Sequence, residues 1–209
     1  MAKIKTKTAF LCSVCGDDFP KWNGQCPSCK EWGTLSEFKV SAKKNGRKHE
    51  PRGTKSLTDV LTANSGERIS TGLKEADRVL GGGLLSGSLI LLGGSPGVGK
   101  STLALHICSG INRKALYISA EESEEQVALR ARRLNIKPDQ LFLSGENELD
   151  GIISHIDRIQ PDLVIVDSIQ TVMNSGLDSL PGSPSQIRDC GQRLLEVSKQ
   201  KNVTILIVG

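Results

Sequence analysis

Apolar residues form five short runs in the C-terminal two thirds of the chain, and each has the length of a buried strand. The runs lie at residues 88–92, 115–119, 141–143, 163–166 and 203–208. Segments with helical periodicity lie between most of them, at residues 101–109, 124–134, 149–159 and 186–201. This alternation predicts an α/β fold in which helices pack on the faces of a parallel sheet.

The N-terminal third lacks this pattern and divides into two parts. Residues 1–38 contain four cysteines in two close pairs, which predicts a C4 zinc finger. Residues 39–66 are basic and show no apolar periodicity, which predicts a flexible linker with a short anchoring helix at residues 56–61. Residues 67–209 then make up the α/β domain.

The cysteine pairs follow the pattern C-x₂-C-x₁₀-C-x₂-C and consist of Cys12, Cys15, Cys26 and Cys29. Four thiolates suit one tetrahedral Zn²⁺ and leave no open position, so we expect a structural site. A redox dithiol pair or two disulfides are the alternatives, and an intracellular chain favours zinc over both. Trp22 and Trp32 flank the second pair. We expect them to pack over the metal core, with a binding surface as the alternative.

Residues 94–101 read G-x-x-x-x-G-K-S between a predicted strand and a predicted helix, which is the pattern of a phosphate-binding loop. Glycines let the backbone N–H groups turn inward toward phosphate oxygens, and the helix N-terminus adds partial positive charge. Lys100 is predicted to reach the β- and γ-phosphates, and Ser101 to offer its hydroxyl to Mg²⁺. The candidate nucleotide-binding residues are Gly94, Ser95, Pro96, Gly97, Val98, Gly99, Lys100, Ser101 and Thr102. An ordinary strand-to-helix turn is the alternative.

Two of the five apolar runs are followed by acidic residues. Asp167 follows the run at 163–166, and the carboxyl end of a parallel strand is where α/β proteins bind ligands, so we expect Asp167 to hold Mg²⁺ through water. Glu121 follows the run at 115–119 and is the candidate general base, which completes the catalytic set with Lys100 and Asp167. A turn role for Asp167 and a helix-end role for Glu121 stay open. Ser123 is the predicted N-cap of the next helix.

A loop at residues 171–185 leaves the same predicted edge, so a contact with a polymer is one interpretation of it. Cys108 and Cys190 are isolated and are expected to be small core residues.

Composition agrees with a globular protein, since 37% of the residues are hydrophobic and 24% are charged. The net charge of +4 is uneven: residues 1–60 hold 12 Lys/Arg against 6 Asp/Glu, and the remainder 15 against 17. The basic part could attract nucleic acid or could be a solvated tail. The absence of a long apolar run or signal-like segment predicts a cytoplasmic protein.

Several motifs together resemble one known family. They are the four cysteines with Trp22-x-Gly24 and Trp32-Gly33-Thr34, then Arg68-Ile69-Ser70-Thr71-Gly72, Asp77-Arg78-Val79-Leu80-Gly81-Gly82-Gly83 and the loop at 94–101. This combination resembles the N-terminal portion of the bacterial RadA (Sms) family of DNA repair proteins, which are RecA-like and DnaB-like ATPases.

The resemblance implies a RecA-like core that uses ATP, Mg²⁺ and Zn²⁺, assembles into hexamers and binds single-stranded or branched DNA. It also implies helicase-like branch migration in homologous recombination with RecA as partner. The residues at 94–101 match the family's ATP-binding loop, the four cysteines its zinc finger, and Glu121 and Asp167 its catalytic acids. Family members continue beyond residue 209, so we expect a C-terminally truncated ATPase domain. A zinc-ribbon P-loop kinase and a nucleotide-regulated protein-binding module remain as alternatives.

Overall fold

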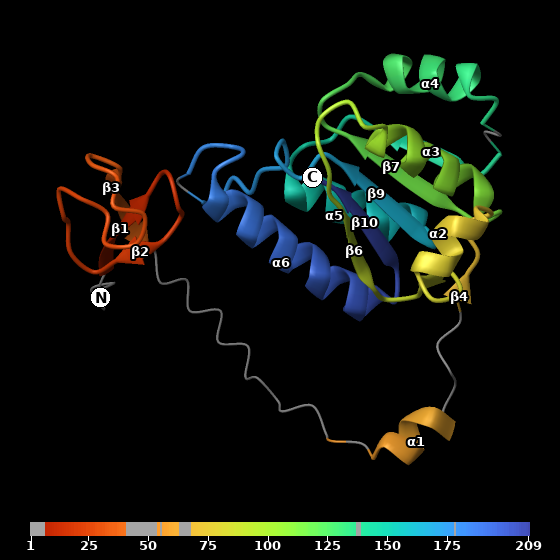
Figure 1. Cartoon of the computed structure of the whole chain (residues 1–209), viewed down its shortest axis with the longest axis horizontal. Helices are drawn as coiled ribbons and strands as arrows, with labels where there is room; N and C mark the ends of the chain where they lie inside the picture. Colours follow the sequence, from red (N-terminus) through yellow and green to blue (C-terminus); the bar gives the residue numbers. More distant parts are fainter. Residues whose placement is uncertain (1–6, 41–53, 55, 63–67, 137–138, 178) are drawn as a thin grey trace. The chain divides into compact units, whose positions relative to one another are not determined.

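The computed structural model describes residues 7–40, 54, 56–62, 68–136, 139–177 and 179–209 (Figure 1). Most of the predicted linker, 39–66, therefore lies outside the described residues. The chain divides into two compact units, one made up of residues 1–65 and 183–185 and the other of residues 66–182 and 186–209. Each unit is described by itself.

The N-terminal unit contains a three-stranded antiparallel sheet in the order β2-β1-β3. Its strands are β1 (Lys7–Cys12), β2 (Asp18–Phe19) and β3 (Leu35–Val40). The core is small and consists of Cys12, Cys26 and Leu35, with Phe10 and Phe19 packed against them. A separate short helix, α1 (Leu57–Thr62), occupies the position of the predicted one.

Trp22 and Trp32 are absent from this core, being 60% and 74% exposed, so the expectation that they pack over the metal site is wrong. Among the described residues, the apolar cluster of this unit is made up of the four cysteines, Leu35, Phe10 and Phe19. The two indoles are therefore left on the surface.

The C-terminal unit contains a five-stranded parallel sheet in the order β6-β10-β9-β7-β8, which confirms the predicted fold class. Its strands are β6 (Leu89–Leu92), β7 (Ala115–Ser119), β8 (Leu141–Ser144), β9 (Leu163–Asp167) and β10 (Thr204–Val208). β10 lies between β6 and β9, as the RecA-like arrangement requires.

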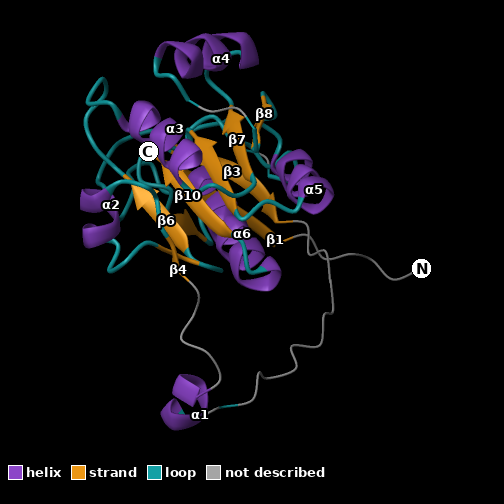
Figure 2. Ribbon diagram, turned by 90° about the vertical axis from the view of Figure 1, so that its right-hand side faces the viewer, coloured by secondary structure: helices purple, strands orange, loops and turns teal. Residues whose placement is uncertain are grey.

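Helices cover both faces of this sheet (Figures 1 and 2). They are α3 (Lys100–Gly110), α4 (Glu124–Arg133), α5 (Leu149–Ile159) and α6 (Pro184–Lys201). Because side chains alternate along a strand, Val164 and Val166 of β9 pack with α5 and α6, while Leu163 and Ile165 pack with α3 and α4. Each face thus has its own apolar layer.

A small subdomain precedes the sheet. It consists of the antiparallel pair β4 (Arg68–Ile69) and β5 (Leu84–Leu85) with the helix α2 (Lys74–Val79) between them. Asp77 of α2 accepts hydrogen bonds from the Ser70 hydroxyl at 2.6 Å and from the Thr71 hydroxyl and N–H at 2.7 and 2.8 Å. These bonds hold the chain at Thr71 against the end of α3, where Gly110 lies.

Candidate functional site

The predicted phosphate-binding loop connects β6 to α3. Residues 93–99 are exposed, and Gly97 and Gly99 have left-handed φ values of +77° and +100°. A side chain would be strained at either position, so glycine is needed there. Gly99 is the N-cap of α3 and provides no capping side chain, so the first-turn N–H groups of the helix face no side-chain acceptor. Such a helix start is suited to an anion.

Lys100 lies across this loop. Its Nζ donates hydrogen bonds to the carbonyl oxygens of Gly94 at 2.6 Å and Ser95 at 3.1 Å. The ammonium group is therefore held on the inner side of the turn, and its neutral carbonyl partners are ones that a charged phosphate oxygen can replace. This donor set fits the triphosphate of a nucleotide.

The strand ends place the predicted acids at the same edge as the loop. Leu92 of β6 pairs with Val208 of β10, Val208 with Asp167 of β9, and Asp167 with Ser119 of β7. Four strands thus end at one level, and two strand spacings separate Asp167 from Leu92 by about 10 Å. Asp167 shares the α3 face with Leu163 and Ile165 because it lies an even number of residues from both.

Asp167 and Glu121 are each hydrogen-bonded to a hydroxyl from the other strand. The Tyr117 hydroxyl of β7 donates to Asp167 Oδ2 at 2.5 Å, and the Ser168 hydroxyl after β9 donates to Glu121 Oε1. Asp167 is 9% exposed, whereas Glu121 is exposed. The peptide bond between Asp167 and Ser168 is cis. Tyr117 was not among the residues identified from the sequence, although alternation along β7 would have placed it on the α3 face.

The acids after Glu121 have other partners. Glu122 forms an ion pair with Arg130 of α4. Ser123 is the N-cap of α4 and forms a capping box with Gln126, as predicted. Glu124 accepts a hydrogen bond from the Gly145 N–H at 3.0 Å. Glu121 is therefore distinguished from these neighbours by its contact with the Asp167–Ser168 turn.

The loop after β9 is more ordered than its length suggested. Gln186 of α6 is buried; its Oε1 accepts from the Asn174 N–H at 2.9 Å, and its Nε2 donates to the carbonyls of Asn174 and Ser179. Glu148 accepts from the N–H and hydroxyl of Ser175. Leu180 near the loop's end is 80% exposed. The loop is thus fixed at its base and presents its outer part to solvent.

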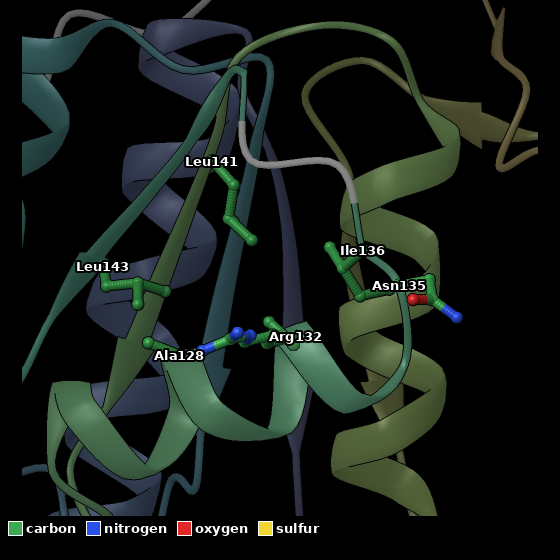
Figure 3. A pocket seen from close by; sticks show the side chains of 7 residues that line it. Ala128, Arg132, Asn135, Ile136, Leu141 and Leu143 are labelled. Atoms are coloured by element: carbon green, nitrogen blue, oxygen red, sulfur yellow. The ribbon is translucent and has the colours of Figure 1, made fainter.

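A cleft of about 520 Å³ lies between α4 and β8 (Figure 3). Its lining is mostly apolar and includes Ala128, Ile136, Leu141 and Leu143. β8 is the edge strand opposite to β6 in the sheet order, so this cleft is separate from the loop at residues 94–101.

In the N-terminal unit the four predicted zinc ligands come together, with all their Sγ atoms within 4.8 Å of one another. The distances are 3.6 Å for Cys12–Cys29 and 3.6 Å for Cys15–Cys26, too long for disulfides. Zn–S bonds of about 2.3 Å give tetrahedral S···S edges of about 3.8 Å, so the cluster fits Zn²⁺.

The two halves of the cluster share one backbone design. The N–H groups of Gly16 and Lys30 each donate, at 2.9 Å, to the carbonyl of the cysteine four residues earlier. Both residues have positive φ values, +73° and +60°. Each C-x-x-C segment therefore turns in the same way and directs both of its sulfur atoms to one side.

The thiols of this cluster titrate differently. Burial acts to raise the pKa of Cys12, but hydrogen bonds with the Cys15 backbone and Thr34 outweigh it and lower that pKa to about 6. The Glu31 backbone acts to lower the pKa of Cys29, whereas burial and the adjacent thiols raise it to about 12. Four thiols this close do not all ionise without a cation among them, which again fits a divalent metal.

None of the helices in the described part of the chain is both long and apolar enough to cross a bilayer.

Comparisons with known proteins find family matches in both parts of the chain. Residues 59–209 match the AAA domain family, and residues 10–37 match the rubredoxin metal binding domain family. DNA repair protein RadA of Listeria monocytogenes serovar 1/2a is 42% identical over 100% of this chain and 47% of its own length. RadA of Rickettsia bellii is 45% identical over 97% of this chain and 46% of its own length. RadA of Bacillus subtilis is 42% identical over 98% of this chain and 47% of its own length.

These relatives confirm the resemblance inferred from the sequence motifs. The chain spans about half the length of the curated relatives that it matches.

Proposed function

Because this chain belongs to the AAA domain family, we propose that it binds ATP with Mg²⁺ and hydrolyses it in DNA repair. The RadA relatives support the DNA repair part of this proposal, since they match nearly the whole chain. The proposal also includes the N-terminal unit, which we take to be a structural module around a Zn²⁺ ion bound by Cys12, Cys15, Cys26 and Cys29.

One observation carries the proposal. The carboxyl ends of β6, β10, β9 and β7 are in register, with the phosphate-binding loop after β6 and acids after β9 and β7. Hydrolysis needs a phosphate cradle, a metal-side carboxylate and a group that orients water, all within the reach of one triphosphate. The edge of this sheet supplies candidates for all three.

In this proposal the backbone N–H groups of residues 94–102, except Pro96, which has none, and the Lys100 ammonium bind the phosphates. Ser101 would hold Mg²⁺ through its hydroxyl, and Asp167 through water. Bound Mg²⁺ supplies positive charge against the charge that develops on the phosphoryl oxygens. Glu121 would orient the attacking water and accept its proton, a role for which its exposed carboxylate is accessible.

We extend the proposal to DNA on the name that the relatives carry. The chain would then act as part of a DNA-dependent ATPase with helicase-like activity, which assembles as a homo-hexamer and promotes branch migration with RecA. The exposed outer part of the loop at 171–183 supports a contact with single-stranded DNA, because it leaves the catalytic edge of the sheet.

The first test is ATP binding and hydrolysis by Lys100→Ala, with Lys199→Ala as the control. Lys199 is an exposed lysine in the last turn of α6 and lies outside the proposed site. We expect Lys100→Ala to lose at least tenfold in affinity for a fluorescent ATP analogue and to release no phosphate, while Lys199→Ala behaves as wild type. Equal ATP affinity in all three proteins would show that the loop is not the nucleotide site.

The second test asks what the hydrolysis serves. Phosphate release is measured with and without single-stranded DNA, and ADP formation is measured with a panel of small phosphoryl acceptors. Stimulation by DNA supports the proposal. Turnover that ignores DNA but rises with an acceptor would instead identify the kinase alternative.

The third test concerns Glu121. Replacing a general base typically lowers turnover by about 10²–10⁴-fold without preventing nucleotide binding. Glu121→Gln should therefore bind ATP normally and hydrolyse it slowly. Glu125→Gln, an exposed acid in the first turn of α4, is the matched control and should retain full turnover.

A further inference from the structure

The hydroxyl of Tyr117 lies against the proposed magnesium site and has no part in the roles assigned above. We infer that Tyr117 is a positioning residue that fixes the carboxylate of Asp167 for the Mg²⁺-bound water, an inference that rests on the proposed function.

The contact depends on the register between two neighbouring strands. Tyr117 of β7 pairs with Ile165 of β9, two residues before Asp167, and its side chain is long enough to reach forward over that interval. Alternation places Tyr117 and Asp167 on the same face. Their oxygens approach to 2.5 Å, the length typical of a hydrogen bond from a hydroxyl to a charged carboxylate.

The ring of Tyr117 lies among apolar side chains. Tyr117 is 0% exposed and belongs to a cluster with Ala115, Leu163, Ile165 and Val208. A phenyl ring would satisfy this packing, and a buried hydroxyl is unfavourable without a hydrogen-bond partner. The hydroxyl of Tyr117, the chain's one tyrosine, therefore points to a function beyond packing.

The Tyr117 hydroxyl donates its hydrogen bond to Oδ2 of Asp167 and so holds the carboxylate in one orientation. In the proposed site the other oxygen, Oδ1, would then be the one available to the Mg²⁺-bound water. Groups behind a metal ligand commonly orient it in this way.

The test is the Mg²⁺ dependence of ATP binding by Tyr117→Phe, which keeps the ring and removes the donor. A fluorescent ATP analogue is titrated at a series of Mg²⁺ concentrations and in EDTA. We expect the affinity in EDTA to stay within twofold of wild type, because the phosphate-binding loop is intact. The Mg²⁺ midpoint, which is the Mg²⁺ concentration that gives half of the maximal gain in ATP affinity, should rise about tenfold.

Ile118→Val is the matched control, since Ile118 is the next residue of β7 and packs on the opposite face with α5 and α6. It weakens the packing of the same strand but should leave the Mg²⁺ midpoint unchanged. Asp167→Asn is the reference for a protein that has lost the proposed Mg²⁺ ligand. The Mg²⁺ midpoint of Tyr117→Phe should lie between those of wild type and Asp167→Asn. Thermal melting of each variant separates a lost fold from a lost contact.

A second measurement does not need the variant to fold. Because the chain has one tyrosine, 3-fluorotyrosine labels position 117 alone. Its ¹⁹F resonance should shift when Mg²⁺ is added to the ATP complex.

A Mg²⁺ midpoint for Tyr117→Phe within twofold of wild type overturns the inference and leaves the proposed function intact. An unchanged ¹⁹F resonance does the same. If the wild-type chain itself shows no ATP binding with Mg²⁺, the proposed function fails and the inference fails with it.

Discussion

Replacing Gly110 with alanine should strongly destabilise the C-terminal unit, although alanine is the better helix former. Gly110 is the last residue of α3 and lies directly against the backbone of Thr71. A Cβ atom built on Gly110 would stand 1.9 Å from the Thr71 carbonyl oxygen and 2.8 Å from its carbonyl carbon. Because Cβ contacts shorter than 3.0 Å are essentially never tolerated, the two backbones would have to separate by about 1 Å.

Thr71 cannot move alone, which sets the size of the effect. It is 0% exposed, and its N–H and hydroxyl both donate to Asp77. Overpacking typically destabilises by about 1–3 kcal/mol, and loss of one hydrogen bond to a charged group by about 1.5–3 kcal/mol. The helix-propensity gain of alanine offsets at most about 1 kcal/mol. We therefore expect a net loss of about 3 kcal/mol in the free energy of unfolding.

Gly191→Ala is the matched control, because Gly191 also lies in a helix, α6, and a Cβ there would meet no atom within 4 Å. It should gain about 0.5–1 kcal/mol. At about 2–4 °C per kcal/mol for a unit of this size, Gly110→Ala should melt about 6–12 °C below wild type and Gly191→Ala a few degrees above it.

Circular dichroism at 222 nm is the suitable probe, because both tryptophans lie in the N-terminal unit and do not report on the helices. Equal melting temperatures for Gly110→Ala and wild type would refute the close approach of α3 to Thr71. A shift of the same sign in both alanine variants would show that the structure does not distinguish the two glycines.

Two further perturbations test the small subdomain and the zinc site. Hydrogen bonds from Ser70 and then from Thr71 lower the pKa of Asp77, so its stabilising contribution is present above the unfolded-state pKa of about 4 and is lost as the pH falls through the lower folded-state pKa. Asp77→Asn should therefore be less stable than wild type in urea at pH 7, and the gap should narrow as the pH falls below about 4; a gap independent of pH would contradict this assignment. Removal of zinc with a chelator should unfold the segment around the four cysteines, seen as a change in tryptophan fluorescence, while ellipticity at 222 nm is largely retained. Loss of both signals together would mean that the two units do not fold independently.

The parallel sheet was predictable because its three central strands, β7, β9 and β10, are buried on both faces and therefore appear as continuous apolar runs. The helix starts were predictable where a side chain marks them, as Ser123 does for α4. α6 begins at Pro184, two residues before the predicted start, because the fixed φ of proline suits the first turn of a helix. The elements β2, β4 and β5 span two residues each, too few for any periodicity to reveal them.

The candidate site was predictable only in part, because only residues close together in the sequence form a recognisable pattern. Gly94, Lys100 and Ser101 form a local motif, and the four cysteines another, so their spacing along the chain carries the signal. The contact of Tyr117 with Asp167 joins residues 50 apart in sequence and depends on the register of two strands. Such a contact is decided by tertiary structure and leaves no local pattern.

The two acids are connected more closely than the sequence suggested. The Tyr117 hydroxyl of β7 binds Asp167 at the end of β9. The Ser168 hydroxyl, just after β9, binds Glu121, which follows β7. Any change that separates these two strands therefore displaces Asp167 and Glu121 together. A substitution at one acid also releases the hydroxyl that belonged to it, and that hydroxyl is then free to bind water or the other acid. The roles of Asp167 and Glu121 consequently have to be separated by pairing each acid substitution with that of its own hydroxyl partner, since groups that share a network do not contribute additively.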